Sequence, residues 1–154
     1  MIRVYTKERH REKINQFLTS INLEHEICTI KNDLPLKPFE LGVSYAYPRK
    51  ILDPILTTPK KGFVNYHPGP LPDYKGPNQY RNAIDNQEID WGVTVHYMNE
   101  EYDEGPIIKV KKIKLHEPPT AIEELGAISH YFLFDLFKET ILDIFNEKLE
   151  STPQ

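Results

Sequence analysis

The chain has 154 residues, of which 39% are hydrophobic and 27% are charged, a composition that supports one folded core with a soluble surface. Its net charge of −4 and lack of long Lys or Arg runs argue against nucleic-acid partners. Cys28 is the single cysteine, which excludes an intrachain disulfide and favours a reducing cytoplasm. The charged N-terminal segment is unlike a signal peptide, and no apolar run is long enough to cross a membrane. We therefore expect one cytoplasmic domain over residues 1–150, followed by a frayed tail at 151–154.

The first third of the chain alternates predicted strands with helical or irregular segments. Residues 2–6 (IRVYT) are strand formers, and the apolar residues of 14–21 have the spacing of an amphipathic helix. Residues 25–30 and 41–47 read as two further strands, and Pro48 closes the second of them. This alternation predicts an α/β domain with a mainly parallel sheet. A Gly-rich phosphate-binding turn does not follow the first strand.

A stiff loop follows the next predicted strand. The strand is the short apolar run 62–65, and residues 67–79 (HPGPLPDYKGPNQ) contain four prolines and two glycines. Residues 77–86 then favour a short helix that begins near Pro77.

The last part of the chain predicts a hairpin and a long helix. Residues 91–98 and 106–115 are strands that can pair, with a bulge expected between Val110 and Ile113. From Leu125 onward the apolar residues fall on one helical face, which predicts a C-terminal helix packed on the sheet.

Asn65 and His67 are the first candidate site residues. If residues 63–67 are extended, the two side chains point to the same side of the strand. Pro68 holds His67 near the extended conformation, and ligands bind at the carboxyl ends of strands in open α/β sheets. The alternative is a structural histidine beside a turn-forming asparagine.

Asp103 is the second candidate, in an acidic loop between the two hairpin strands. Its carboxylate could orient or ionise His67 if the fold brings the loops together. The alternative is a solvated acidic turn. His96 is expected to be a partly buried structural residue, and a His67, His96 and Asp103 metal centre lacks any recognisable ligand spacing.

A resemblance to a known family rests on four motifs in order. They are GFVNYHPGPLPDYKG, AIDN, WGVTVHYM and EYDEGPII, within residues 41–115. In this order and spacing they resemble the catalytic core of the folate-dependent formyltransferases, which include the glycinamide ribonucleotide, methionyl-tRNA and sugar N-formyltransferases. The resemblance implies a single Rossmann-like formyltransferase domain. Residues 2–6 look like the second strand of that family, so the N-terminal half is expected to be abbreviated.

The resemblance also implies an activity and a site. The catalytic residues would be Asn65, His67 and Asp103, which transfer a formyl group from 10-formyltetrahydrofolate to a primary amine without a metal. The residues expected to border the pterin pocket are Tyr47, Pro48, Arg49, Ile51 and Asp103.

The acceptor implied by the resemblance is a nucleotide-linked amino sugar. The expected acceptor contacts are Lys75, Asn78 and Tyr80. Glycinamide ribonucleotide, or another small amine, is an alternative acceptor, and a non-catalytic folate- or sugar-nucleotide-binding remnant is an alternative function. Loss of the first strand would expose a sheet edge, which predicts a homodimer.

Overall fold

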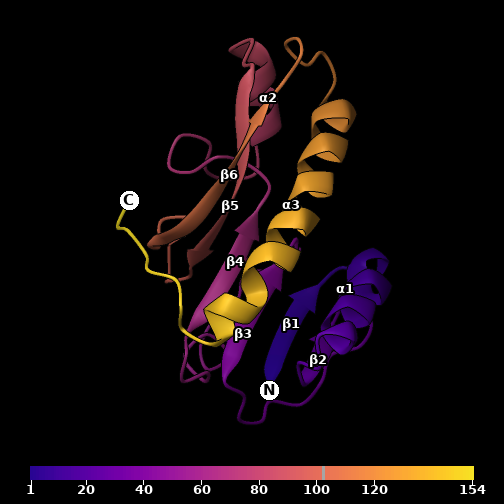
Figure 1. The fold of residues 1–154 in the computed structure, drawn as a ribbon, viewed down its shortest axis with the longest axis vertical. Helices are drawn as coiled ribbons and strands as arrows, with labels where there is room; N and C mark the ends of the chain where they lie inside the picture. Colours follow the sequence, from indigo (N-terminus) through magenta and orange to yellow (C-terminus); the bar gives the residue numbers. More distant parts are fainter. Residues whose placement is uncertain (102) are drawn as a thin grey trace.

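The computed structural model describes residues 1–101 and 103–154, and its strands form one mixed sheet (Figure 1). The elements are β1 (Ile2–Thr6), α1 (Glu8–Ser20), β2 (His25–Cys28), β3 (Leu41–Tyr45), β4 (Phe63–His67), α2 (Gln79–Asp85), β5 (Asp90–Tyr97), β6 (Ile107–Lys114) and α3 (Ile122–Phe145). The six strands lie in the order β2-β1-β3-β4-β5-β6. The first four are parallel, β5 is antiparallel to β4, and β6 is antiparallel to β5. The predicted mainly parallel α/β domain is therefore confirmed.

Strands β1 and β3 are buried on both faces, and most of their residues are apolar or small, although Arg3 and Thr6 of β1 are buried polar residues. All five residues of β1 and all five of β3 are buried. β1 lies between β2 and β3, so the strands at the two edges of the sheet are β2 and β6.

Helices α1 and α3 cover one face of this sheet side by side (Figure 1). Phe17 of α1 packs edge-on against Phe137 of α3, with ring centres 6.0 Å apart. Leu133, Leu136 and Ile141 of α3 are fully buried in the same core, as the apolar spacing predicts. The opposite face carries a smaller apolar cluster that includes Phe63 and Ile51, and loops pack over it.

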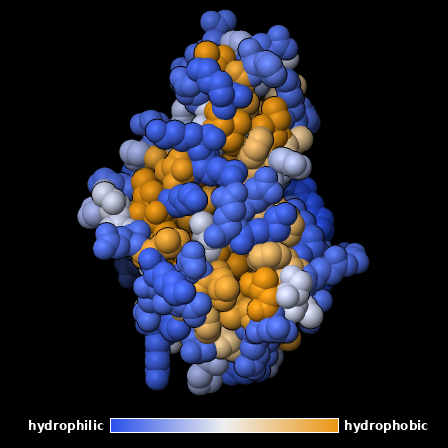
Figure 2. Space-filling model, in the orientation of Figure 1, coloured by the Kyte–Doolittle hydropathy of each residue, from blue (hydrophilic) through white to orange (hydrophobic). Residues whose placement is uncertain are grey.

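The outer surface of the helical layer retains apolar side chains. On α3, Ile122, Tyr131 and Leu142 are exposed, and Figure 2 shows apolar residues gathered on this face of the molecule. The homodimer remains a prediction. Within the described residues, no helix combines the length and apolar character needed to span a membrane.

Several local predictions differ from the structure. The bulge lies at Ile108, because Val95 pairs with Lys109 and His96 with Ile107, leaving Ile108 as the extra residue. It therefore lies nearer the start of β6 than the predicted position. β4 continues beyond 62–65 to His67, whereas β2 ends at Cys28 and β3 ends at Tyr45.

The tail is exposed but not frayed. Thr152 pairs with Ile107 at the start of β6, and the backbone N–H of each residue donates to the carbonyl of the other over 2.8 Å. The amino-acid sequence of the tail has no apolar pattern, so its attachment depends on the free backbone groups at the edge of β6.

Candidate active site

Strand β4 presents two polar side chains on the face opposite α3. Asn65 and His67 share this face with Phe63, whereas Val64 and Tyr66 point into the helical core. Tyr66 is tied to α3 through its hydroxyl, which lies 2.9 Å from the hydroxyl of Thr140. The period-two prediction for this strand is confirmed, and the anchored Tyr66 fixes the strand that carries both candidates.

The proline-rich loop of residues 67–79 fixes the His67 ring through a hydrogen bond from one of its nitrogens. Its ring is 5% exposed, and Nε2 donates a hydrogen bond to the backbone carbonyl of Tyr74 over 2.7 Å. The Tyr74 ring packs on Trp91, with centres 4.9 Å apart, so the loop that carries this carbonyl is fixed. The other ring nitrogen, Nδ1, faces Asp103.

Asp103 enters the site from the loop between β5 and β6. Its backbone has φ of 55°, the left-handed region, and its side chain is 8% exposed. Oδ2 accepts a hydrogen bond from the backbone N–H of Gly76 over 2.9 Å. Position 102 of this loop lies outside the described residues. The buried carboxylate is not the solvated turn that an acidic run usually forms.

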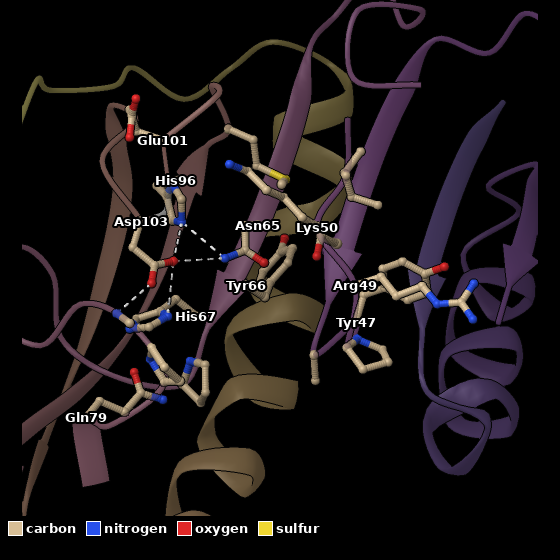
Figure 3. Close-up of a pocket in the computed structure, with 18 of the residues that line it drawn as sticks. Tyr47, Arg49, Lys50, Asn65, Tyr66, His67, Gln79, His96, Glu101 and Asp103 are labelled. Carbon is tan, nitrogen blue, oxygen red and sulfur yellow. Dashed lines mark hydrogen bonds and ion pairs between the residues drawn. The ribbon is translucent and has the colours of Figure 1, made fainter. Parts of the chain in front are cut away.

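Three nitrogen atoms converge on one oxygen of Asp103 (Figure 3). Oδ1 lies 3.4 Å from Nδ1 of His67, 3.5 Å from Nδ2 of Asn65 and 3.7 Å from Nε2 of His96. The structure therefore brings together the three residues that the sequence singled out, although they are as far apart in the chain as 65 and 103.

His96 belongs to this cluster, which the sequence analysis did not predict. Nδ1 donates to the backbone carbonyl of Tyr97 over 2.8 Å, so Nε2 is left to accept from Asn65 over 3.2 Å. Its ring is buried, as expected, but it lines the pocket and contacts two candidate residues. The alternation along β5 placed His96 on the correct face, but the pairing of β5 with β4 was needed to place it beside Asn65.

Burial and neighbouring charges act in opposite directions on the pKa of His67 and on that of Asp103. Burial lowers the pKa of His67 below its usual value, and the Asp103 carboxylate and the Tyr74 carbonyl only partly oppose this effect. Burial acts to raise the pKa of Asp103, but the His67 ring and the hydrogen bond from the Gly76 N–H hold it below its usual value. Asp103 is therefore ionised near neutral pH, and His67 binds its proton only weakly.

The cluster lies in a pocket of about 450 Å³, within the range of small-molecule sites. Figure 3 shows Tyr47 and Arg49 at one end of the pocket and Gln79 on the other side of His67. The expected pterin-pocket residues that line it are Tyr47, Pro48, Arg49, Ile51 and Asp103. Lining residues that the sequence analysis missed include Gln79 and Met98.

Comparison with known proteins decides the family. The family model described as formyl transferase matches residues 29–130 of this chain. The chain belongs to the formyl transferase family. The matched segment contains all three predicted catalytic positions, so the family assigned from the motifs is confirmed.

The related sequences and structures agree with this assignment. Methionyl-tRNA formyltransferase of Staphylococcus aureus is 33% identical over 118 residues, which cover 75% of this chain and 37% of the relative. The corresponding enzyme of Thermotoga neapolitana is 33% identical over 106 residues, covering 69% of this chain and 32% of the relative. The chain thus spans about a third of the length of these curated relatives.

The similar solved structures are formyltransferases of several kinds. The formyltransferase PseJ from Anoxybacillus kamchatkensis has a TM-score of 0.80 and 24% identity, covering 99% of this chain and 80% of that one. Phosphoribosylglycinamide formyltransferase from Bacillus halodurans has a TM-score of 0.74 and 20% identity, covering 94% of this chain and 93% of that one. These likenesses establish that the fold is that of a formyl transferase.

The expected acceptor contacts lie beside this formyl transferase pocket rather than on its wall. Lys75 lies 3.7 Å from a carboxylate oxygen of Glu104, Asn78 is exposed, and Tyr80 packs against Trp91 with ring centres 6.4 Å apart. None of these three is among the described residues that line the pocket, whereas Gln79 is. The sequence alone could not show which of the consecutive polar residues of this loop turns toward the pocket.

The sequence does not favour a metal centre at His67, His96 and Asp103, because these residues lack a recognisable ligand spacing. Among the described residues, no group of three or more His, Cys, Asp or Glu side chains is arranged to hold a metal ion.

Proposed function

We propose that this protein is an N-formyltransferase that moves the formyl group of 10-formyltetrahydrofolate to a primary amine. The observation that carries the proposal is the convergence of Asn65 and His67 on Asp103 inside a pocket of small-molecule size. A carboxylate, an imidazole and an amide donor in one buried cluster are suited to acyl transfer, which needs both proton movement and stabilisation of an oxygen anion.

The pocket residues fit the folate donor. Ile51 is buried, and Tyr47 and Met98 add apolar surface at the same end, as a flat ring system requires. Arg49 is exposed where it lines the pocket, a position suited to the carboxylates at the far end of a folate. When bound, the donor supplies a formyl carbon: its bond to the acceptor nitrogen forms, its bond to N10 breaks, and the proton lost by the amine ends on N10.

The chain's own residues then have distinct tasks. Nδ2 of Asn65 and Nδ1 of protonated His67 face Asp103 in the free protein, and with the donor bound they share their hydrogens with the formyl oxygen as that oxygen gains negative charge. The growing negative charge favours the imidazolium, which offsets the lowering of the His67 pKa by burial. Asp103 holds the ring and accepts the proton that leaves the amine on its way to N10.

We infer that the acceptor amine is on a nucleotide-linked sugar. This inference is supported by the structural neighbour PseJ, which is described as a complex with a UDP-linked formamido sugar and tetrahydrofolate. Another neighbour, WlaRD, is described as a sugar 3N-formyl transferase, with a TM-score of 0.83 and 19% identity over 99% of this chain and 65% of that one. An acceptor of this kind has a reactive amine on a small sugar, which can reach a buried cluster of this size.

A panel of acceptors tests the proposal. The protein is incubated with 10-formyltetrahydrofolate and with UDP- and dTDP-linked 3-amino or 4-amino sugars, glycinamide ribonucleotide and methionyl-tRNA. Release of tetrahydrofolate, together with a sugar product heavier by one formyl group, is the expected result. Transfer only to another acceptor would contradict the sugar assignment. Folate binding without turnover on any acceptor would contradict the proposed enzyme and favour the non-catalytic remnant.

A further inference from the structure

The backbone of Asp103 requires support that its own side chain does not provide. Asp103 has φ of 55°, in the left-handed region, which costs most residues with a Cβ roughly 1–2 kcal/mol and aspartate less. The Gly76 N–H fixes one carboxylate oxygen, but it does not fix the main chain from which the carboxylate extends. Small changes in that main chain would change the distances from Oδ1 to His67 and Asn65.

Gln154 supplies that support from the C-terminal tail. Its Nε2 donates to the backbone carbonyl of Asp103 over 2.8 Å and to that of Gly105 over 2.7 Å. A side-chain NH₂ group has two hydrogens, so one donor group can satisfy both carbonyls. The two bonds fix the chain on both sides of Glu104.

The register of the tail explains why Gln154 arrives at this point. Thr152 pairs antiparallel with Ile107. Moving two residues along each strand in opposite directions places Gln154 across from Gly105 and on the same side of the backbone as Thr152. Figure 1 shows the tail leaving the end of α3 and running beside the end of the β5–β6 hairpin.

We propose that Gln154 is a positioning residue that keeps the carboxylate of Asp103 between His67 and Asn65. The role rests on the proposed function, because it acts through the catalytic aspartate. In this role the tail supports the loop that carries Asp103. None of the described residues that line the pocket belongs to the tail.

Two variants test this role. Gln154→Ala removes both hydrogen bonds, and Gln154→Glu keeps the shape but replaces the donor with an acceptor that faces two carbonyls. Because a hydrogen bond contributes on the order of 1 kcal/mol, Gln154→Ala is expected to lower kcat by about 5- to 30-fold, and Gln154→Glu by at least as much. KM for the acceptor should stay within twofold of wild type. Gln16→Ala, at an exposed glutamine of α1, is the matched control.

Three measurements distinguish positioning of Asp103 from a merely structural effect of the substitution. In an Asp103→Asn background, adding Gln154→Ala should lower kcat by less than twofold, because the carboxylate that it positions is already absent. The alkaline limb of the pH–rate profile should move to lower pH in Gln154→Ala, since a displaced Asp103 raises the His67 pKa less. Amide hydrogen exchange at residues 103–107 should accelerate while the rest of the sheet is unchanged.

Three outcomes would overturn the proposal. An active wild type with an unchanged Gln154→Ala would contradict the role of Gln154 alone. Equal losses from Gln154→Ala in both backgrounds would show that it acts independently of Asp103, which also contradicts the proposal. A wild type that transfers formyl to no acceptor would contradict the proposed function and this role together.

Discussion

The side-chain amide of Asn65 lies 3.2 Å from Nε2 of His96, and this contact determines which way the amide faces. Because Nδ1 of His96 donates to the Tyr97 carbonyl, Nε2 has a lone pair that accepts from Nδ2 of Asn65. The NH₂ group of Asn65 is thereby turned toward Asp103. An amide in the opposite orientation would place its oxygen, rather than a donor, where the formyl oxygen gains charge.

Removal of either donor should slow transfer strongly. Asn65→Ala and His67→Ala are each expected to lower kcat by about 10²- to 10³-fold, the usual loss for one positioned oxyanion donor. Steady-state assays with the best acceptor measure the loss, and circular dichroism checks the fold. Near-wild-type turnover by His67→Ala would rule out the mechanism even though the fold is established.

Asp103→Asn should change both the rate and its pH dependence. The Asp103 charge raises the pKa of His67, so its removal moves an already lowered pKa further down. The protonated imidazole is then lost at lower pH, and the alkaline limb of the pH–rate profile should shift to lower pH as kcat falls. A profile that keeps its wild-type position would show that Asp103 does not govern the proton on His67.

Gly105→Ala should disrupt the turn that carries Asp103. A Cβ at position 105 would lie 1.7 Å from the backbone oxygen of Tyr97, so the hairpin must open. We expect the free energy of unfolding to fall by about 1–3 kcal/mol, as in other overpacked sites, and transfer activity to fall with it.

Gly126→Ala is the matched control in α3. There the nearest atom to a new Cβ is a Tyr80 ring carbon at 3.5 Å, an ordinary contact. Alanine in a helix is favoured over glycine by about 1 kcal/mol, so this variant should be slightly stabilised. Chemical denaturation of both variants measures the difference, and equal effects would contradict the clash at Gly105.

Acid should destabilise the protein through two histidines on the helical face. Burial, together with neighbouring lysine and arginine side chains, lowers the pKa of His10 to about 3 and that of His130 to about 4. Their rings stack with centres 5.6 Å apart. Unfolded histidine has a pKa of about 6.5, so the unfolded chain binds more protons below that pH. Stability present above about pH 6.5 is therefore lost as the pH falls toward the folded values.

Thermal unfolding between pH 7.5 and 4.5 measures this effect. Each histidine that gains a proton only on unfolding contributes about 1.4 kcal/mol per pH unit. The melting temperature of a His10→Gln, His130→Gln double variant should fall less with pH than that of the wild type. Parallel pH curves for the two proteins would contradict the assignment.

The amino-acid sequence by itself determined most of the fold and identified the candidate site residues. Apolar spacing located the helices, and the period of two along β4 placed Asn65 and His67 on one face, because these patterns depend only on local backbone geometry. The family motifs named Asp103 as their partner. The bulge was misplaced because the pairing of β5 with β6 decides it, and that pairing joins residues distant in the chain.

Tertiary structure alone decided the remaining contacts of the site. The pairing of β4 with β5 set His96 beside Asn65, the start of α2 turned Gln79 rather than Asn78 toward the pocket, and the free edge of β6 captured the tail. None of these contacts has a local sequence pattern, because each depends on where a second segment lies. For the same reason, a glutamine in an unpatterned tail reaches the backbone of Asp103.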